Sequence, residues 1–347
     1  MKSVFRNYFV NILLIVGFTA LALWFALKDD FNQVVNSILK VDFWRLGVVI
    51  LAVIVFQLII GWILQQFAKQ TKPDYKLKQG FLNALVAAFF HGITPSSTGG
   101  QFAQVYVFHK QGIKGEDAAG ILILDFIVNQ IVVIALGLLL LVIKFPYFSS
   151  NSFFFLSLAG FLANATFVTL TALCAFNRKV YIWVTKKGLN IGVKLHIIKD
   201  KQKAIDNLDE KLEGFSKGVE QLSHNKKLLV KVVSANIVRM LLYFSIPMIC
   251  AWALKIKSAD WLTMVALASF VSNVNAFIPI PGASGGTEST FIVMFTEIMT
   301  KANASSLMVL WRFSTFHLVM IVGAITFIRI QNSKTVNKTP QPEKEAS

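Results

Sequence analysis

Charged residues are scarce in this sequence. Asp, Glu, Lys and Arg together make up 15% of its 347 residues, whereas soluble domains carry about 25%. Hydrophobic residues make up 55% of the chain, and apolar runs long enough to cross a hydrocarbon core recur along it. There is too little charge to cover the surface of an ordinary soluble protein. The composition therefore predicts an all-α polytopic integral membrane protein.

Residues for several kinds of chemistry are also missing. The two cysteines, Cys174 and Cys250, both lie in apolar segments, where they suit small buried side chains better than a disulfide or a metal site. None of the five histidines pairs with another at the spacing of metal ligands. The phosphate-binding pattern G-x-x-x-x-G-K-[ST] does not occur, which argues against a nucleotide-driven pump. We therefore expect no catalytic residue, no metal and no cofactor.

Acidic residues are the scarcer sign of charge. There are 18 Asp and Glu against 34 Lys and Arg, which gives a formal net charge of +16. In a soluble protein this balance would suggest nucleic-acid binding. Here the basic residues crowd the loops between apolar runs, as in loops that stay in the cytoplasm and face anionic lipid. We expect no direct nucleic-acid partner.

Six apolar segments have the length of full membrane spans, at about twenty residues per crossing. Lys2 and Arg6 precede the first of them, which we interpret as a retained helix rather than a cleaved signal peptide. Two shorter apolar segments, near 81–93 and 261–280, run into glycine and proline and are predicted to be broken or re-entrant. The six spans are 8–27, 43–67, 118–143, 153–176, 229–253 and 304–330.

Loop charges predict the orientation of the chain. The loop 68–80 is rich in lysine, and the loop 177–227 carries twelve Lys and Arg against six Asp and Glu. Both loops are expected in the cytoplasm with the two termini, whereas the loop 144–152, which has one charge, is expected outside. The prediction is a multi-pass protein of a bacterial-type plasma membrane, with a membrane domain at 1–330 and a disordered polar tail at 331–347.

Apolar residues within the loop 177–227 recur at helical spacing, which predicts a basic amphipathic helix. We expect this helix to lie on the inner membrane surface. A docking site for a separate lipid-modifying enzyme is the alternative. The apolar positions are Ile205, Leu208, Leu212, Phe215 and Val219.

The two interrupted segments share a pattern. The first contains TPSSTGGQ and the second IPIPGASGGTE, and both read P-x-x-[ST]-G-G when their prolines are aligned. Proline removes an N–H and glycine frees the backbone, so carbonyls and amides become available. Irregular backbone is tolerated at membrane depth only where protein or water satisfies it. The candidate substrate-binding residues here are Pro95, Ser97, Thr98, Gly99, Gly100, Gln101, Pro281, Ser284, Gly285, Gly286 and Glu288.

In the predicted topology the first interrupted hairpin enters from the cytoplasm and the second from outside. This is an inverted-repeat arrangement, and paired breaks of this kind indicate a midplane substrate site in transporters. The amino ends of the half-helices carry partial positive charge, which suits a phosphate. Ordinary loops at the membrane surface are the alternative interpretation.

Ionisable residues inside apolar segments add further candidates, because a charge in the membrane interior is costly. Asp125, Arg239 and Arg312 lie in predicted spans. In the functional interpretation, Asp125 and Glu288 meet a cationic lipid headgroup and Arg312 meets its phosphate. In the alternative, these charges pair with one another and leave nothing for a ligand.

The segments TPSSTGGQFAQVYVFHKQGI and IPIPGASGGTEST, with Arg312 in the last span, resemble signature segments of the lysylphosphatidylglycerol synthase transmembrane-region family, also called the flippase-like domain family. The resemblance covers nearly the whole chain, to about Ile330. It implies lipid handling: in bifunctional members the membrane part is associated with moving aminoacylated phosphatidylglycerol between leaflets. A separate cytosolic domain of those members transfers lysine from lysyl-tRNA, and no such domain follows here before Ser347.

Three functions stay open at this point. The leading interpretation is translocation of a membrane phospholipid, aminoacylated or otherwise, such as lysylphosphatidylglycerol. One alternative is phosphatidylglycerol lysyltransferase activity, with resistance to cationic antimicrobial peptides, exerted together with a separate catalytic chain. The other is a non-transporting membrane partner of a lipid-modifying enzyme. A homo-oligomer is compatible with each of them.

Expressed alone in a bacterial host that makes no lysylphosphatidylglycerol, the inserted protein is expected to yield none of this lipid, because no acyl-transfer constellation is found. Mass spectrometry of the membrane lipids measures the outcome. If lysylphosphatidylglycerol appears, this chain has transferase activity and the interpretation is wrong.

Overall fold

The computed structural model describes residues 35–36, 39–94, 99–149, 154–177, 180, 219–220, 222–257, 260–275, 278 and 280–332. Every regular element among them is helical, and no strand occurs in this part of the chain. The all-α prediction is therefore confirmed for the described residues. In chain order the elements are α3 (Phe43–Ala68), α4 (Leu77–Ile93), α5 (Gly99–Lys110), α6 (Gly115–Ile143), α7 (Phe145–Ser149), α8 (Phe154–Phe176), α11 (Lys226–Ala253), α12 (Trp261–Asn275), the 3₁₀ turn η2 (Pro281–Ala283), α13 (Gly286–Phe295), α14 (Lys301–Arg312), the π-helix η3 (Phe313–His317) and α15 (Leu318–Asn332).

Four helical stretches are long and apolar enough to cross a membrane, and each coincides within a few residues with a predicted span. They are Phe43–Ala68, Gly115–Ile143, Lys226–Ala253 and Lys301–Asn332, the last made of α14, η3 and α15. A fifth predicted span, 153–176, coincides with α8. The first predicted span, 8–27, lies outside the described residues.

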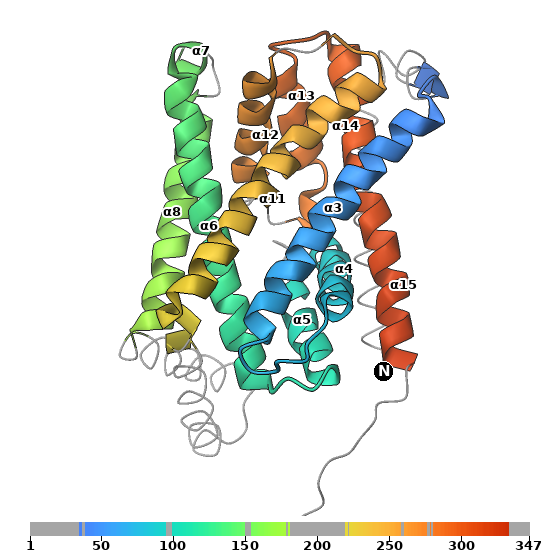
Figure 1. Cartoon of the computed structure of the whole chain (residues 1–347). Helices are drawn as coiled ribbons and strands as arrows, with labels where there is room; N and C mark the ends of the chain where they lie inside the picture. Colours follow the sequence, from blue (N-terminus) through green and yellow to red (C-terminus); the bar gives the residue numbers. More distant parts are fainter. Residues whose placement is uncertain are drawn as a thin grey trace, which may run out of the picture.

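The long helices run between two ends of the molecule (Figure 1). At the end drawn at the bottom, α3 and α15 finish, whereas α6 and α11 begin. The largest apolar core lies at the packing of α11, α12, α13 and α14, where Phe291 stacks on Phe295 and Trp311 with ring centroids 4.0 and 4.9 Å apart. Cys250 lies fully buried in this core as a free thiol, as expected of a small apolar side chain.

Both interrupted segments fold as pairs of packed helices. Helix α4 stops at Ile93 and α5 starts at Gly99, whereas α12 stops at Asn275 and α13 starts at Gly286. The pair α4 and α5 occupies the lower half of the molecule and the pair α12 and α13 the upper half, with the two breaks near mid-height (Figure 1). Neither apolar segment therefore continues to the opposite end of the molecule as an unbroken helix.

Polar contacts close the lower end of the bundle around Tyr75. The Tyr75 hydroxyl donates to Gln111 Oε1 at 2.5 Å, and Lys72 Nζ donates to the Gln111 carbonyl at 2.8 Å. Gln65 Nε2 donates to the Tyr75 carbonyl at 3.1 Å. Burial raises the pKa of Tyr75 above its usual range, so the phenol stays neutral and keeps donating. These bonds join the α3–α4 loop to the turn that follows α5.

Asp260 anchors the opposite end. Its carboxylate accepts the Thr263 hydroxyl at 2.7 Å and the Thr263 N–H at 3.1 Å, which caps the start of α12. Lys144, at the end of α6, lies 3.2 Å from the same carboxylate. The Thr263 hydroxyl, helped by Lys144, holds the pKa of Asp260 at about 2. The carboxylate therefore stays ionised and holds the start of α12 beside the end of α6.

Helices α3 and α4 pack closely, with backbone next to backbone at two glycines. A methyl group on Gly80 would lie 2.1 Å from the Gly61 carbonyl oxygen, and one on Gly61 would lie 2.6 Å from the Phe81 backbone. Lipid tails are as apolar as a helix surface, so membrane helices associate mainly through close packing. Small residues at a crossing allow this close packing. Gly80 is therefore a packing requirement of the fold.

Gly80→Ala is expected to lower the free energy of unfolding by about 1–3 kcal/mol, because the added methyl overlaps backbone that cannot move aside. The thermal midpoint of the detergent-solubilised protein, followed by tryptophan fluorescence, measures the change. Gly47→Ala is the matched control on α3, since nothing lies within 4 Å of the added group. Equal midpoints for the two variants would contradict the close contact.

Candidate functional site

The break before α13 is built from left-handed backbone. Gly282 and Gly285 have φ angles of +61° and +84°, which glycine adopts without steric cost. Ala283 also lies in this region, at φ +51°, where a Cβ costs about 1–2 kcal/mol. The Thr287 hydroxyl donates to the Ala283 carbonyl at 2.9 Å and helps to hold this turn. The glycines of the second motif are thus required by the path of the chain.

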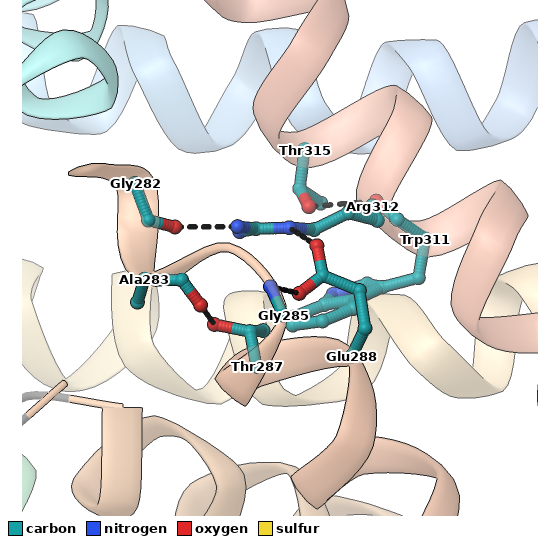
Figure 2. A network of polar contacts seen from close by, with 8 residues as sticks. All are labelled: Gly282, Ala283, Gly285, Thr287, Glu288, Trp311, Arg312 and Thr315. Carbon is teal, nitrogen blue, oxygen red and sulfur yellow. Dashed lines mark hydrogen bonds and ion pairs between the residues drawn. The ribbon is translucent and has the colours of Figure 1, made fainter. Parts of the chain in front are cut away.

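A buried ion pair closes this break (Figure 2). Arg312, the last residue of α14, donates from Nε to Glu288 Oε1 at 2.8 Å and from Nη2 to the Gly282 carbonyl at 2.5 Å. The other carboxylate oxygen of Glu288 accepts the Gly285 N–H at 2.6 Å. The side chains of Arg312 and Glu288 are 10% and 1% exposed. The pair therefore joins α14 to both sides of the turn.

These contacts decide what the second motif offers to a ligand in this structure. Glu288 lies in the first turn of α13 and accepts the N–H of Gly285, the residue just before that helix. It therefore takes up the partial positive charge that we predicted to face a phosphate. Glu288 and Arg312 follow the alternative in which membrane charges pair internally. Their direct contact with a lipid stays a prediction.

Two further residues of the second motif are buried here. Pro281 starts the 3₁₀ turn, and Ser284 is 0% exposed. The Ser284 hydroxyl has no hydrogen-bond partner among the described residues. A buried hydroxyl without a partner is costly. The described residues therefore leave one costly unsatisfied group in this motif, the Ser284 hydroxyl.

The first break shows only its two flanks. Pro95, Ser97 and Thr98 lie outside the described residues. The Thr94 hydroxyl donates to the Phe90 carbonyl at 2.6 Å and accepts the Gly99 N–H at 2.9 Å, which links the end of α4 to the start of α5. Gln101, two residues into α5, is half-buried.

The second glycine of each motif serves close packing. A methyl on Gly100 would lie 2.3 Å from the His91 ring, and one on Gly286 would lie 2.3 Å from the Ile278 side chain. In both cases the clash is with the segment that leads into the break. The shared G-G pair thus allows each chain reversal to stay tight, which explains its recurrence without invoking a ligand.

The end of α4 meets the second break. A methyl on Gly282 would lie 3.1 Å from the Gly92 carbonyl oxygen and 2.4 Å from Cζ of Phe316. Gly92 is in the last turn of α4, so residues separated by 190 positions lie in contact beside one aromatic ring. Neither Gly92 nor Phe316 was a candidate from the sequence, because an apolar helix offers many glycines and aromatics and no local signal separates these two.

Asp125, half-buried on α6, and Arg239, buried on α11, form a second polar group. Arg239 is 5% exposed, so its side chain stays inside the bundle. Its Nη2 donates to Asn129 Oδ1. Asp125 lies one turn before Asn129 on α6, so the two side chains share one face of the helix. Both Asp125 Oδ1 and Arg239 Nε lack a hydrogen-bond partner among the described residues.

A ladder of amide side chains continues from Asn129. Asn129 donates to Gln130 Oε1 at 3.3 Å, and Gln130 donates to Asn164 Oδ1 at 2.9 Å. Asn164 donates to Asn273 Oδ1 at 3.2 Å, which joins α8 to the last turn of α12. The sequence carried a usable signal for Asn164 and Asn273, since a lone amide in an apolar helix needs an internal partner.

The fold and these contacts define a class: a multi-pass helical membrane protein with two interrupted helix pairs, in which the end of α4 meets the break between α12 and α13 inside the bundle. The model of the family described as lysylphosphatidylglycerol synthase TM region matches residues 9–323. The chain belongs to this family, which confirms the resemblance seen in its motifs. No individual curated protein matches the chain.

Glu288→Gln and Arg312→Gln are each expected to destabilise the protein by about 3–5 kcal/mol, because either change leaves one buried charge unpaired. The double variant should recover part of this loss. Thermal unfolding in detergent measures all three. Lys144→Gln, which breaks the more exposed pair with Asp260, is the control and should cost about 1 kcal/mol or less. Single variants as mild as this control would show that the pair does not hold the break.

Proposed function

We propose that this protein translocates phospholipid between the leaflets of a membrane, with an aminoacylated phospholipid such as lysylphosphatidylglycerol as its substrate class. The observation that carries the proposal is the contact of Gly92, in the last turn of α4, with Gly282 in the second break. Helix α4 ends and α13 begins near mid-height of the bundle (Figure 1). Irregular backbone at that depth brings carbonyls and amides to a level where the bilayer has none. Membership of a family named for lysylphosphatidylglycerol synthesis supports this lipid class.

The two broken helix pairs are proposed to be re-entrant hairpins of an inverted repeat. The pair α4 and α5 starts and finishes at the lower end, and α12 and α13 start and finish at the upper end (Figure 1). Hairpins that enter from opposite sides and meet at mid-depth give a substrate one site reachable from each leaflet in turn. Gly99, Gly100, Gln101, Ser284 and Gly285 would then line that site, with Glu288 and Arg312 holding its upper half.

The lower end is proposed to face the cytoplasm. The loop between α3 and α4 carries lysines there, as does the start of α11, and basic loops stay on the cytoplasmic side. Since α15 finishes at the same end (Figure 1), the C-terminus would be cytoplasmic too. The membrane potential would supply about 2.3 kcal/mol per charge per 100 mV, enough to bias the distribution of a cationic lipid.

Reconstitution tests the proposal. The protein is placed in vesicles containing lysylphosphatidylglycerol, and the lipid amines are titrated with an amine-reactive reagent that does not cross membranes. Protein-free vesicles should expose only the outer-leaflet lipid, whereas vesicles with the protein should expose the inner-leaflet lipid as well. Identical labelling in the two preparations would rule out translocation of this lipid.

The family name also favours a second candidate, in which the chain assists lysylphosphatidylglycerol synthesis by a separate enzyme. The loop 177–227 would provide the docking site. Its end is anchored to the bundle: Val219 and Leu222 are buried, and Asn225 donates to Gln70 Oε1 at 3.1 Å. Most of the predicted amphipathic helix lies outside the described residues. Affinity purification with and without residues 181–218 would distinguish this role, since only docking requires them.

A further inference from the structure

Phe316 lies where the end of α4 and the second break touch. Its Cζ would lie 2.4 Å from a methyl on Gly282 and 3.4 Å from one on Gly92. One face of its ring is covered by the Arg312 guanidinium, whose Cζ lies 3.9 Å from the ring centroid. The ring is therefore held between the ion pair, the second break and the end of α4.

The backbone under Phe316 has the geometry of a conformational joint. Residues Phe313–His317 form a π-helix between α14 and α15, with the Leu318 N–H bonded to the Phe313 carbonyl five residues earlier. A π-helix holds one residue more per turn than an α-helix and occurs mostly as a single turn at functional sites. Relaxation to α-helical geometry would rotate the following side chains by about 100°, the angle per residue in an α-helix.

Hydroxyl groups stabilise the widened turn from within. Ser314 Oγ donates to the Leu310 and Trp311 carbonyls at 2.8 and 3.1 Å, and Thr315 Oγ1 donates to the Trp311 carbonyl at 2.6 Å. Such bonds bend helices and supply partners to carbonyls whose backbone register is changed. The hydroxyls of Ser314 and Thr315 thus stabilise the π-helix, and the π-helix places the Phe316 ring next to Gly282 and Gly92.

We propose that Phe316 is the closing residue of the path between the two helix breaks, and that its movement, driven by a change of helical register at Phe313–His317, opens this path to a polar headgroup. The structure shows the closed arrangement, in which the ring leaves no room for a methyl on Gly282 and would lie in ordinary contact, at 3.4 Å, with one on Gly92. Arg312 lies just before the π-helix, and its guanidinium covers the Phe316 ring. Movement of the ring would therefore also remove this cation–π contact from the ion pair. The role in lipid passage rests on the proposed function; the closure itself does not.

Water access to Ser284 tests the closure without any lipid assay. Ser284→Cys is made in a protein with Cys174 and Cys250 replaced by alanine, and its labelling by a membrane-impermeant maleimide is timed. In the parent labelling should be slow, because Ser284 is fully buried. With Phe316→Ala it should be about tenfold faster, since an aromatic and cation–π contact of this kind biases an equilibrium by about a decade.

Phe313→Ala is the matched control. Phe313 lies in the same π-helix but is 48% exposed, so its removal should leave the labelling rate unchanged. Phe316→Leu retains most of the side-chain volume, so its labelling rate should fall between those of the parent and Phe316→Ala. This graded response distinguishes loss of closure from misfolding. Labelling rates are compared only among variants that have equal thermal midpoints. Parental labelling in Phe316→Ala, or equal acceleration in Phe313→Ala, overturns the proposal.

The lipid assay then separates the two ideas. If Phe316→Ala accelerates both maleimide labelling and lipid movement, the closing residue controls the proposed translocation. If it accelerates labelling while the parent protein moves no lipid, the closure stands and the proposed function fails. If the parent moves lipid and Phe316→Ala changes neither rate, the function stands and the closure is wrong.

Discussion

Broken backbone inside an apolar layer must find its hydrogen bonds within the protein, and the arrangement of this molecule depends on how that requirement is met at the second break. Two side chains meet it. Arg312 satisfies the Gly282 carbonyl, and Glu288 satisfies the Gly285 N–H. Their charges neutralise each other at 2.8 Å. Without this pair, the Gly285 N–H and the Gly282 carbonyl would lose these partners, and their turn would lose the contact that joins it to α14.

A buried ion pair is rarely the most stable way to join two helices, because removing two charges from water costs several kcal/mol each. Its advantage here is position. Apolar packing between helices in a bilayer discriminates weakly among registers, since lipid tails are as apolar as the partner helix. A guanidinium that reaches a carboxylate and one specific carbonyl fixes both the rotation of α14 and the height of the turn. The same contacts set the conditions for a ligand, which must compete with them or enter beside them.

The helix positions could be predicted from the sequence, because span length follows from bilayer thickness and breaks follow from glycine and proline. Thus α3, α6, α8 and α11 fall within a few residues of their predictions. The partners could not be predicted. Two carboxylates and two arginines allowed several pairings, and only the three-dimensional arrangement joins Glu288 to Arg312 and leaves Asp125 beside Arg239. The role of Phe316 depends on a π-turn that hydropathy does not detect.

The two buried arginines both connect to the pair α12 and α13. Arg312 holds its turn and α13 directly. Arg239 reaches it through the amide ladder, which runs from Asn129 to Asn273 in the last turn of α12. Each amide in the ladder donates onward in the same direction, and aligned hydrogen bonds polarise one another. The charge on Arg239 therefore strengthens the bonds that hold α12, while the charge on Arg312 holds the segment after it. The pair α12 and α13 is therefore bonded at the last turn of α12, at the turn between the helices and at the first turn of α13, so the proposed movement falls to Phe316, which makes no hydrogen bond to this pair among the described residues.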